Sequence, residues 1–162
     1  MKKILLILGL LSFIACQDEW NDDSILPPLG GEQRAYWDIN RMLPLQVKEG
    51  KNNEINSLKV KLLRPSEKII ALPLISGDES VLKAYNAQFG TNYQLLPPAN
   101  YDIDENAIFD QGEREVTVDL LLKEIRFNKN EIYALPLRLE GIKYTPILEG
   151  QDQCLLIISK KE

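Results

Sequence analysis

Histidine is absent from this chain of 162 residues, and cysteine occurs only twice. Without imidazole the chain cannot assemble a Ser-His-Asp or Cys-His catalytic group, a zinc site built on histidine, or the commonest general base near neutral pH. Glycine-rich loops of the kind that cradle phosphates are also missing. We therefore expect a protein that is not an enzyme and that needs no cofactor, with calcium as the one candidate to be weighed.

Clusters of lysine and arginine are also lacking, in a chain whose formal net charge is −5. Proteins that bind phosphate backbones need a basic surface, so we expect no nucleic-acid partner. The two cysteines are Cys16 and Cys154. The second lies in the apolar run over residues 154–158, which predicts a buried thiol, and no disulfide is expected.

An export signal is the clearest feature that the sequence does contain. Two lysines precede an apolar run over residues 4–14, and Ala15 stands immediately before Cys16. This order of charged, apolar and small residues is typical of a cleaved signal. The run is shorter than the roughly 20 residues that a membrane-spanning helix needs. We interpret residues 1–15 as a lipoprotein signal peptide.

The end of this signal, Phe-Ile-Ala-Cys at residues 13–16, resembles the lipobox of bacterial lipoproteins. In a lipobox the cysteine thiol receives a diacylglyceryl group and becomes the new N-terminus. We expect acylated Cys16 to hold the mature protein in the lipid of the outer membrane, because two or three acyl chains anchor a protein durably. The alternative is an ordinary signal peptide cut elsewhere, which would leave Cys16 as a spectator thiol.

Four carboxylates and no basic residue follow the cysteine within residues 17–23. Like charges repel one another and stay solvated, so we predict that residues 16–33 form an acidic, flexible tether. The segment is also similar to the acidic surface-export signal beside the lipid-bearing cysteine of Bacteroidota lipoproteins. This resemblance implies that the folded part, expected as a single domain over residues 34–162, is exposed at the cell surface.

Short β-branched, aromatic and leucine-rich runs, separated by turn residues, dominate the rest of the chain. Alternation is clearest over residues 115–120, where Val116, Val118 and Leu120 share one face. Several such runs with hardly any helix favour a mainly β fold, an antiparallel β-sandwich. The expected strands occupy residues 34–40, 57–64, 68–75, 115–122, 132–140 and 153–159.

Two prolines fall inside these predicted strands, Pro73 and Pro136. Proline has no N–H to donate to a neighbouring strand. We therefore expect each of them at a sheet edge or at a bulge.

One short helix is expected over about residues 78–89. Asp78 or Ser80 can cap its first turn, and its apolar residues recur at helical spacing. Gly90 follows as a natural stop, because glycine tolerates the left-handed conformation that commonly ends a helix.

The helix and the strands after it carry a series of markers in a fixed order. They are Tyr-Asn at 85–86, Gly-Thr-Asn-Tyr at 90–93, Leu-Pro at 96–97, Gly-Glu at 112–113 and Tyr-Ala-Leu-Pro-Leu at 133–137. The series, within residues 55–160, resembles the N-terminal domain of unknown function found in Bacteroidota surface lipoproteins. The resemblance implies an immunoglobulin-like β-sandwich, often encoded in glycan-utilisation loci and often followed by a glycoside hydrolase or lectin-like domain. Because this chain ends where the sandwich would end, we expect no attached catalytic domain.

Two aromatic residues are candidates for binding glycan, Trp37 near the tether and Tyr144 in an expected turn. An exposed aromatic ring offers a flat apolar face on which a sugar ring can stack. The alternative for each is packing in the core or cover for a strand edge, since tryptophan is highly buried on average.

A calcium loop is the other candidate site. Five oxygen-bearing residues fall at the first, third, fifth, ninth and twelfth places of an EF-hand-like spacing, namely Asp102, Asp104, Asn106, Asp110 and Glu113. The sixth place, which needs a residue at positive φ, holds Ala107 in place of glycine, and no helix pair flanks the segment. The alternative is a set of solvated loop acids.

These features together predict a lipid-anchored accessory protein of the cell surface, glycan-binding or associated with glycan utilisation, and non-catalytic. Its expected partners are outer-membrane lipid through Cys16 and a polysaccharide. The alternative is a structural or protein-docking module that holds an outer-membrane transporter or hydrolase in place without touching sugar.

Overall fold

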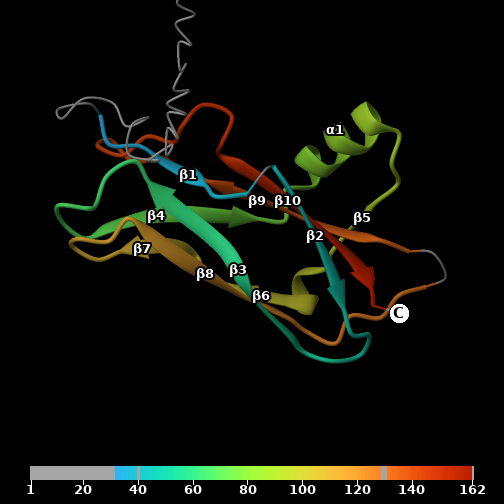
Figure 1. Ribbon diagram of the computed structural model, residues 1–162. Helices are drawn as coiled ribbons and strands as arrows, with labels where there is room; N and C mark the ends of the chain where they lie inside the picture. The colour runs from blue at the N-terminus through green and yellow to red at the C-terminus, as the bar shows by residue number, and fades with distance from the viewer. Residues whose placement is uncertain (1–31, 40, 129–130, 162) are drawn as a thin grey trace, which may run out of the picture.

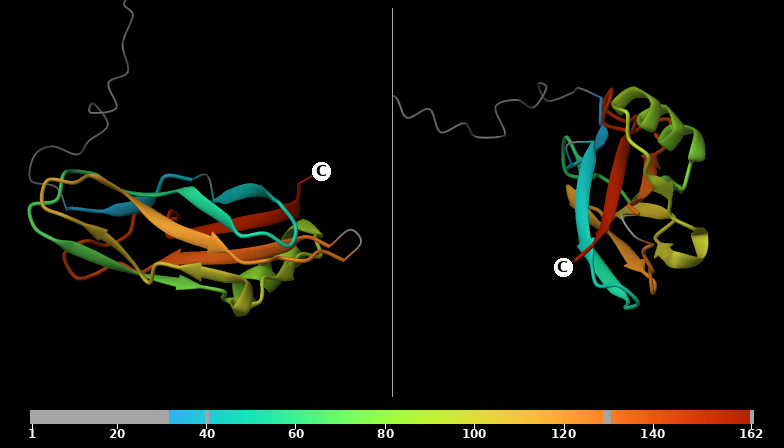
Figure 2. Two further views of the ribbon diagram at one scale, coloured as in Figure 1. Left: turned by 90° about the horizontal axis from the view of Figure 1, so that it is seen from below. Right: turned by 90° about the vertical axis from the view of Figure 1, so that its right-hand side faces the viewer.

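Two β-sheets pack face to face in the computed structural model, with one α-helix on the outside of the larger sheet (Figures 1 and 2). The structure describes residues 32–39, 41–128 and 131–161. The predicted signal peptide, Cys16 and nearly all of the predicted tether lie outside the described residues. No helix of the described part is long and apolar enough to cross a membrane.

The smaller sheet has four strands in the order β1-β3-β8-β6, and every pairing in it is antiparallel. Buried and partly exposed residues alternate along its strands, and the buried ones form its inner face. In β3 these are Leu58, Val60 and Leu62. The four strands are β1 (Ala35–Trp37), β3 (Asn53–Leu62), β8 (Glu115–Leu122) and β6 (Tyr101–Ile103).

The larger sheet has the order β2-β10-β9-β4-β7, with a short sixth strand, β5, beside β9. Two of its pairings are parallel, β2 with β10 and β5 with β9, and the others are antiparallel. The predicted antiparallel sandwich is thus present, with two parallel exceptions. The strands are β2 (Met42–Val47), β10 (Gln153–Lys160), β9 (Tyr133–Leu139), β4 (Ile70–Ser76), β7 (Asn106–Phe109) and β5 (Gln94–Leu95).

The core lies between the inner faces of the two sheets. Its largest fully buried side chains are Trp37 and Phe109, surrounded mainly by leucine, isoleucine and valine from both sheets. Full burial of each such aliphatic side chain contributes about 1.5–3 kcal/mol to folding. A core of this size holds the sandwich together without a disulfide, and Cys154 is a free, buried thiol as predicted.

The helix α1 (Glu79–Phe89) covers the outer face of β9 and β10. Its first turn is capped by Asp78, whose carboxylate accepts a hydrogen bond from the Ser80 backbone N–H at 2.9 Å, and Gly90 ends it at φ 64°. Leu82 of the helix packs with Leu155 and other residues of the outer sheet face in a second apolar cluster. Strand β10 is therefore buried on both faces. A 3-10 helix, η2 (Pro98–Asn100), leads from β5 into β6.

All six predicted strands are present, and four further strands, β2, β5, β6 and β7, were not predicted. The expectation that the two prolines lie at a sheet edge was wrong. Both Pro73 and Pro136 lie in interior strands, because β4 has β9 and β7 as neighbours and β9 has β10 and β4.

Candidate functional site

Trp37, one of the two predicted glycan-binding residues, is a core residue. Its side chain is 1% exposed, and its indole Nε1–H donates to the backbone carbonyl of Asp152 at 3.2 Å. Stacking of a sugar needs an accessible ring face. The sequence-based assignment of Trp37 to glycan binding is therefore corrected: the ring fills the space between the sheets.

Tyr144, the second predicted residue, is 64% exposed and lies in the turn between β9 and β10. The ammonium groups of Lys68 and Lys143 lie 5.3 and 5.2 Å from the centre of its ring, within the range of cation–π attraction. It borders a shallow depression of about 330 Å³. Its role in glycan binding stays a prediction.

The five residues of the predicted calcium loop do not form a loop. Residues 101–103 are strand β6, paired with β8 in the smaller sheet, whereas residues 106–109 are strand β7, paired with β4 on the other sheet. Asp110 and Glu113 follow in a turn, where the Glu113 carboxylate accepts from the Asp110 backbone N–H at 2.7 Å. No group of three or more acidic, cysteine or histidine side chains suited to a metal ion occurs in the described residues.

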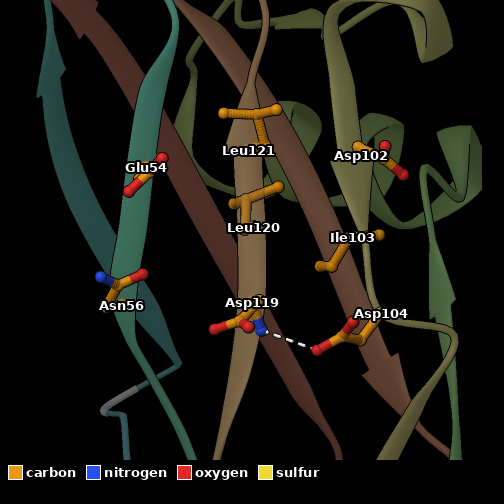
Figure 3. Close-up of a pocket in the computed structure, with 8 residues that line it drawn as sticks. All are labelled: Glu54, Asn56, Asp102, Ile103, Asp104, Asp119, Leu120 and Leu121. Carbon is orange, nitrogen blue, oxygen red and sulfur yellow. Dashed lines mark hydrogen bonds between the residues drawn. The ribbon is translucent and has the colours of Figure 1, made fainter.

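Two of these acids line a depression of about 600 Å³ on the smaller sheet (Figure 3). Their side chains already have partners, because Asp104 accepts from the Asp119 backbone N–H at 2.9 Å and Asp102 pairs with Lys123 at 3.1 Å. Both interactions hold β6 and the residue after it against β8 and the residue that follows it. The acids here serve the sheet edge.

A second depression, of about 580 Å³, lies between α1 and the starts of β2 and β10. We call it the helix groove. The helix contributes one wall, β2 and the residue before it a second, and the turn into β10 a third. The lining residues used below are Arg41, Met42, Tyr85, Gln88, Phe89, Asp152 and Gln153.

The aromatic side of the helix groove comes from the last two turns of α1. Tyr85 and Phe89 are four residues apart, so they stand on one face of the helix, with ring centres 4.6 Å apart. The Tyr85 hydroxyl donates to the Met42 sulfur at 3.2 Å, which joins the helix to β2. Phe89 is 57% exposed and presents its ring to solvent.

The polar side of the groove consists of Arg41, Gln88, Asp152 and Gln153. None of these four side chains has a hydrogen bond or ion pair with another described residue, although all four can donate or accept. They are thus available to a ligand.

Arg41 is held at its place by an unusual backbone. Its φ is 53°, a left-handed conformation that is costly for a residue with a side chain, and it is fixed there by a hydrogen bond from the Leu155 N–H to its carbonyl at 2.8 Å. Gly150 faces it, and a Cβ on Gly150 would come within 3.0 Å of the Arg41 Nη2. The guanidinium therefore occupies space that the glycine leaves open.

The groove is lined by one thiol and one carboxylate. Cys154 lies in its floor, but burial raises the pKa of this thiol to about 12, so the thiolate is scarce at neutral pH. Glycoside hydrolysis normally takes two carboxyl groups, and Asp152 is the only acid among the lining residues.

Sequence reasoning missed this site, although one signal was present. Tyr85 and Phe89 belong to the apolar residues that recur at helical spacing, a pattern that predicts packing and gives no sign that Phe89 is exposed. Arg41 and Asp152 are more than a hundred residues apart and meet only because β2 pairs with β10. No local pattern reports that pairing.

A family model described as an N-terminal domain matches residues 33–144, more than two thirds of the chain. The chain belongs to this N-terminal domain family, and the resemblance inferred from the markers is confirmed. No curated protein matches the sequence.

Similar folds occur in solved structures from Bacteroides. A proposed carbohydrate-binding protein from Bacteroides ovatus superposes with a TM-score of 0.67 at 18% identity, over 80% of this chain and 37% of that protein. An auxiliary nutrient-binding protein from Bacteroides thetaiotaomicron gives 0.57 at 14% identity, over 75% and 44%.

An endoglycosidase provides a third comparison. EndoBT-3987 of Bacteroides thetaiotaomicron, in a structure with a Man5GlcNAc product, gives a TM-score of 0.54 at 13% identity, over 74% of this chain and 28% of that protein. The chain thus spans less than half the length of each of the three proteins. At these identities the likeness establishes the sandwich fold.

Proposed function

We propose that this domain binds carbohydrate in the helix groove, without catalysing a reaction, as an accessory component of the cell surface. The observation that carries the proposal is the exposed Phe89 ring beside four polar side chains that have no partner among the described residues. A sugar ring presents an apolar face of C–H groups and a rim of hydroxyls, and the groove offers a complement to both.

Each wall of the groove has a distinct task in this proposal. Phe89, backed by Tyr85, supplies the surface on which a sugar ring stacks. Arg41 donates and Asp152 accepts hydrogen bonds, so that together they can bind two neighbouring hydroxyls. Binding of this kind needs no metal or cofactor.

The anchor belongs to the same proposal. Acylated Cys16 holds the protein in the outer membrane, and the acidic segment after it directs the domain to the cell surface. The ligand is then a polysaccharide outside the cell, and an outer-membrane transporter or a hydrolase is the partner that uses it. Intact-mass spectrometry of the purified mature protein tests this part, because an unmodified N-terminus would contradict it.

The similar structures support the choice of ligand class. One is a proposed carbohydrate-binding protein and another an auxiliary nutrient-binding protein. The endoglycosidase matches this chain over only 28% of its own length, so its activity does not argue for hydrolysis by this sandwich.

Affinity gel electrophoresis tests the sugar site, with residues 17–162 as the sample and amylopectin, mannan, xylan and polygalacturonate as the probes. We expect retardation by at least one of them. Phe89→Ala should weaken that binding about tenfold, which corresponds to about 1.4 kcal/mol, and Arg41→Ala at least as much because a charged hydrogen-bond donor is lost. Tyr144→Ala is the matched control, since it also removes an exposed ring.

The outcomes separate the candidate functions. Loss of binding in Tyr144→Ala, with Phe89→Ala unaffected, would move the site to Tyr144 as the sequence predicted. Absence of retardation by every probe would overturn carbohydrate binding. If an outer-membrane complex then co-purified with the native protein, the structural or docking module would be the better explanation.

A further inference from the structure

One end of the sandwich gathers the first described residues and two loops. Gln33 donates from Nε2 to the Arg64 carbonyl at 2.7 Å and accepts from the Arg64 N–H at 3.2 Å. The Ala35 N–H donates to the Pro146 carbonyl at 3.0 Å. Gln33 and Ala35, near the start of the described chain, are therefore fixed beside the loop between β3 and β4 and the turn after β9.

This end carries exposed apolar side chains that the core does not use. Ile69 is 68% exposed, Tyr144 64% and Ile142 37%, and they make up three of the six large hydrophobic residues exposed in the described part of the chain. We call the group formed by Ile69, Ile142, Tyr144, Lys68 and Lys143 the tip. Exposed aliphatic and aromatic residues in neighbouring loops can form an interaction surface.

The five tip residues carry two positive charges and no negative one, while Glu67 and Glu113 lie in the segments beside them. Lys68 and Lys143 lie against the Tyr144 ring, and Arg64 lines the depression beside it, where Glu67 is the only acid among the lining residues. The chain as a whole has a net charge of −5. Lysine ammonium groups beside exposed isoleucine and tyrosine can contact anionic headgroups, and each lysine near such a surface contributes about 1 kcal/mol.

We propose that the tip rests on the lipid headgroups of the membrane that holds Cys16. Lysine ammonium groups contact lipid phosphates, tyrosine sits at the headgroup level, and the isoleucines enter the boundary with the acyl chains. This inference rests on the anchor in the proposed function, but not on carbohydrate binding.

The length of the intervening chain fits this arrangement. Fifteen residues, 17–31, separate Cys16 from Glu32, and a chain of that length spans at most about 50 Å. The anchor therefore keeps the tip near the bilayer at a high effective concentration, so that a weak contact suffices. Durable attachment commonly combines a lipid chain with a second, basic signal.

Vesicle sedimentation tests the tip directly with residues 17–162, which retain the complete hydrophobic core and lack the acyl group. The probes are vesicles of phosphatidylcholine alone and of phosphatidylcholine with phosphatidylglycerol in equal parts. We expect binding to the anionic vesicles only, decreasing with added salt. Lys68→Ala and Lys143→Ala should each weaken it about fivefold, and Tyr144→Ala and Ile142→Ala should weaken it as well.

The matched control is Phe89→Ala, which removes an exposed ring from the helix groove and should leave vesicle binding unchanged. Since the tip side chains are exposed, thermal unfolding should confirm that each variant is folded. Equal binding to neutral and anionic vesicles, no binding to either, or unchanged binding in the lysine variants would each overturn the proposal. A free N-terminal thiol by mass spectrometry would remove the anchor while leaving the sugar test intact.

Discussion

Asn86 gives a physical reason for the order of the family markers at the end of α1. Its side chain donates from Nδ2 to the Tyr93 carbonyl at 2.9 Å and accepts from the Thr91 hydroxyl at 2.8 Å and from the Tyr93 N–H at 3.2 Å. One side chain thus ties the last turn of the helix to the extended chain after it. Tyr-Asn and Gly-Thr-Asn-Tyr occur together because they are the two halves of this turn.

Replacing this side chain should destabilise the domain. Asn86→Ala leaves the Tyr93 N–H and carbonyl without their partner in a half-buried place, and we expect a loss of about 1–3 kcal/mol in the free energy of unfolding. Urea denaturation measures it. Asn92→Ala, at an exposed position in the same turn, is the control and should cost little. Equal effects of the two substitutions would contradict the role assigned to Asn86.

The Cys154 thiol should resist modification while the protein is folded. Because burial raises its pKa to about 12, only about one thiol in ten thousand is ionised at pH 8. We expect iodoacetamide to label it only after unfolding in urea, as read by mass spectrometry.

The same shift makes stability fall at alkaline pH. The thiol is neutral in the fold, whereas the unfolded chain ionises near its ordinary pKa of 9.0, so the unfolded state gains as the pH rises from about 9 towards about 12. In the labelling experiment, modification of Cys154 in the native protein at pH 8 at the rate of an exposed thiol would show that β10 opens, and it would contradict the expected protection.

At the scale of single residues the sequence could indicate chemistry but not burial. Trp37 and Tyr144 were equivalent in the sequence, yet one is 1% and the other 64% exposed. The difference arises because β1 pairs with β3 and directs Trp37 into the core, which is a long-range effect. The acids at 102–113 were spaced like a calcium loop, but strand formation placed them on different sheets.

Among the elements, α1 was predicted closely because its ends are encoded locally. Asp78 caps it and Gly90 ends it, and both signals lie in the sequence itself. The short strands β5, β6 and β7 were missed, since two to four residues carry no readable alternation. Strand β2 was missed because Pro44 interrupts it and it runs parallel to β10, far away in the chain.

The two interior prolines depart from the rule that proline is confined to edge strands and bulges, yet they cost the sheet no hydrogen bonds. On the side of β9 that faces away from β10, the neighbour is β5 up to Ala134 and β4 from Leu137 onward. Pro136 falls where the neighbour changes. Strand β4 makes the same change at Pro73, which pairs with β7 while Leu74 pairs with β9. A missing N–H is tolerated at such a position because neither neighbour uses it.

The end of α1 allows a clean test of backbone conformation. Gly90 has φ 64°, and a Cβ added there would meet no atom within 4 Å. Gly90→Ala should therefore lower the free energy of unfolding by about 1 kcal/mol through conformational strain alone. Gly90→Asn should cost less, because asparagine tolerates the left-handed region better. Denaturant unfolding of both variants checks the order, and a neutral alanine variant would contradict it.

For the whole molecule, the two proposed surfaces lie apart. The start of the described chain and the loop between β3 and β4 lie at one end of the sandwich, and α1 lies toward the other, as both figures of the whole chain show (Figures 1 and 2). A domain whose tip rests on lipid would thus turn the helix groove away from the membrane. This is the orientation that a receptor for an external polysaccharide needs.

Hydrogen–deuterium exchange of the native, lipidated protein on anionic vesicles tests that orientation. Backbone N–H groups that contact headgroups are shielded from water, so exchange should slow in residues 63–69 and 141–147 when vesicles are compared with detergent micelles. Exchange in α1 should be the same in both samples, since the helix remains in solvent. Lys68→Ala combined with Lys143→Ala should abolish the protection without releasing the protein from the vesicle, because the acyl chains still hold it. Protection of α1 in place of the tip would mean that the groove faces the lipid, and polysaccharide binding there would then be blocked at the cell surface.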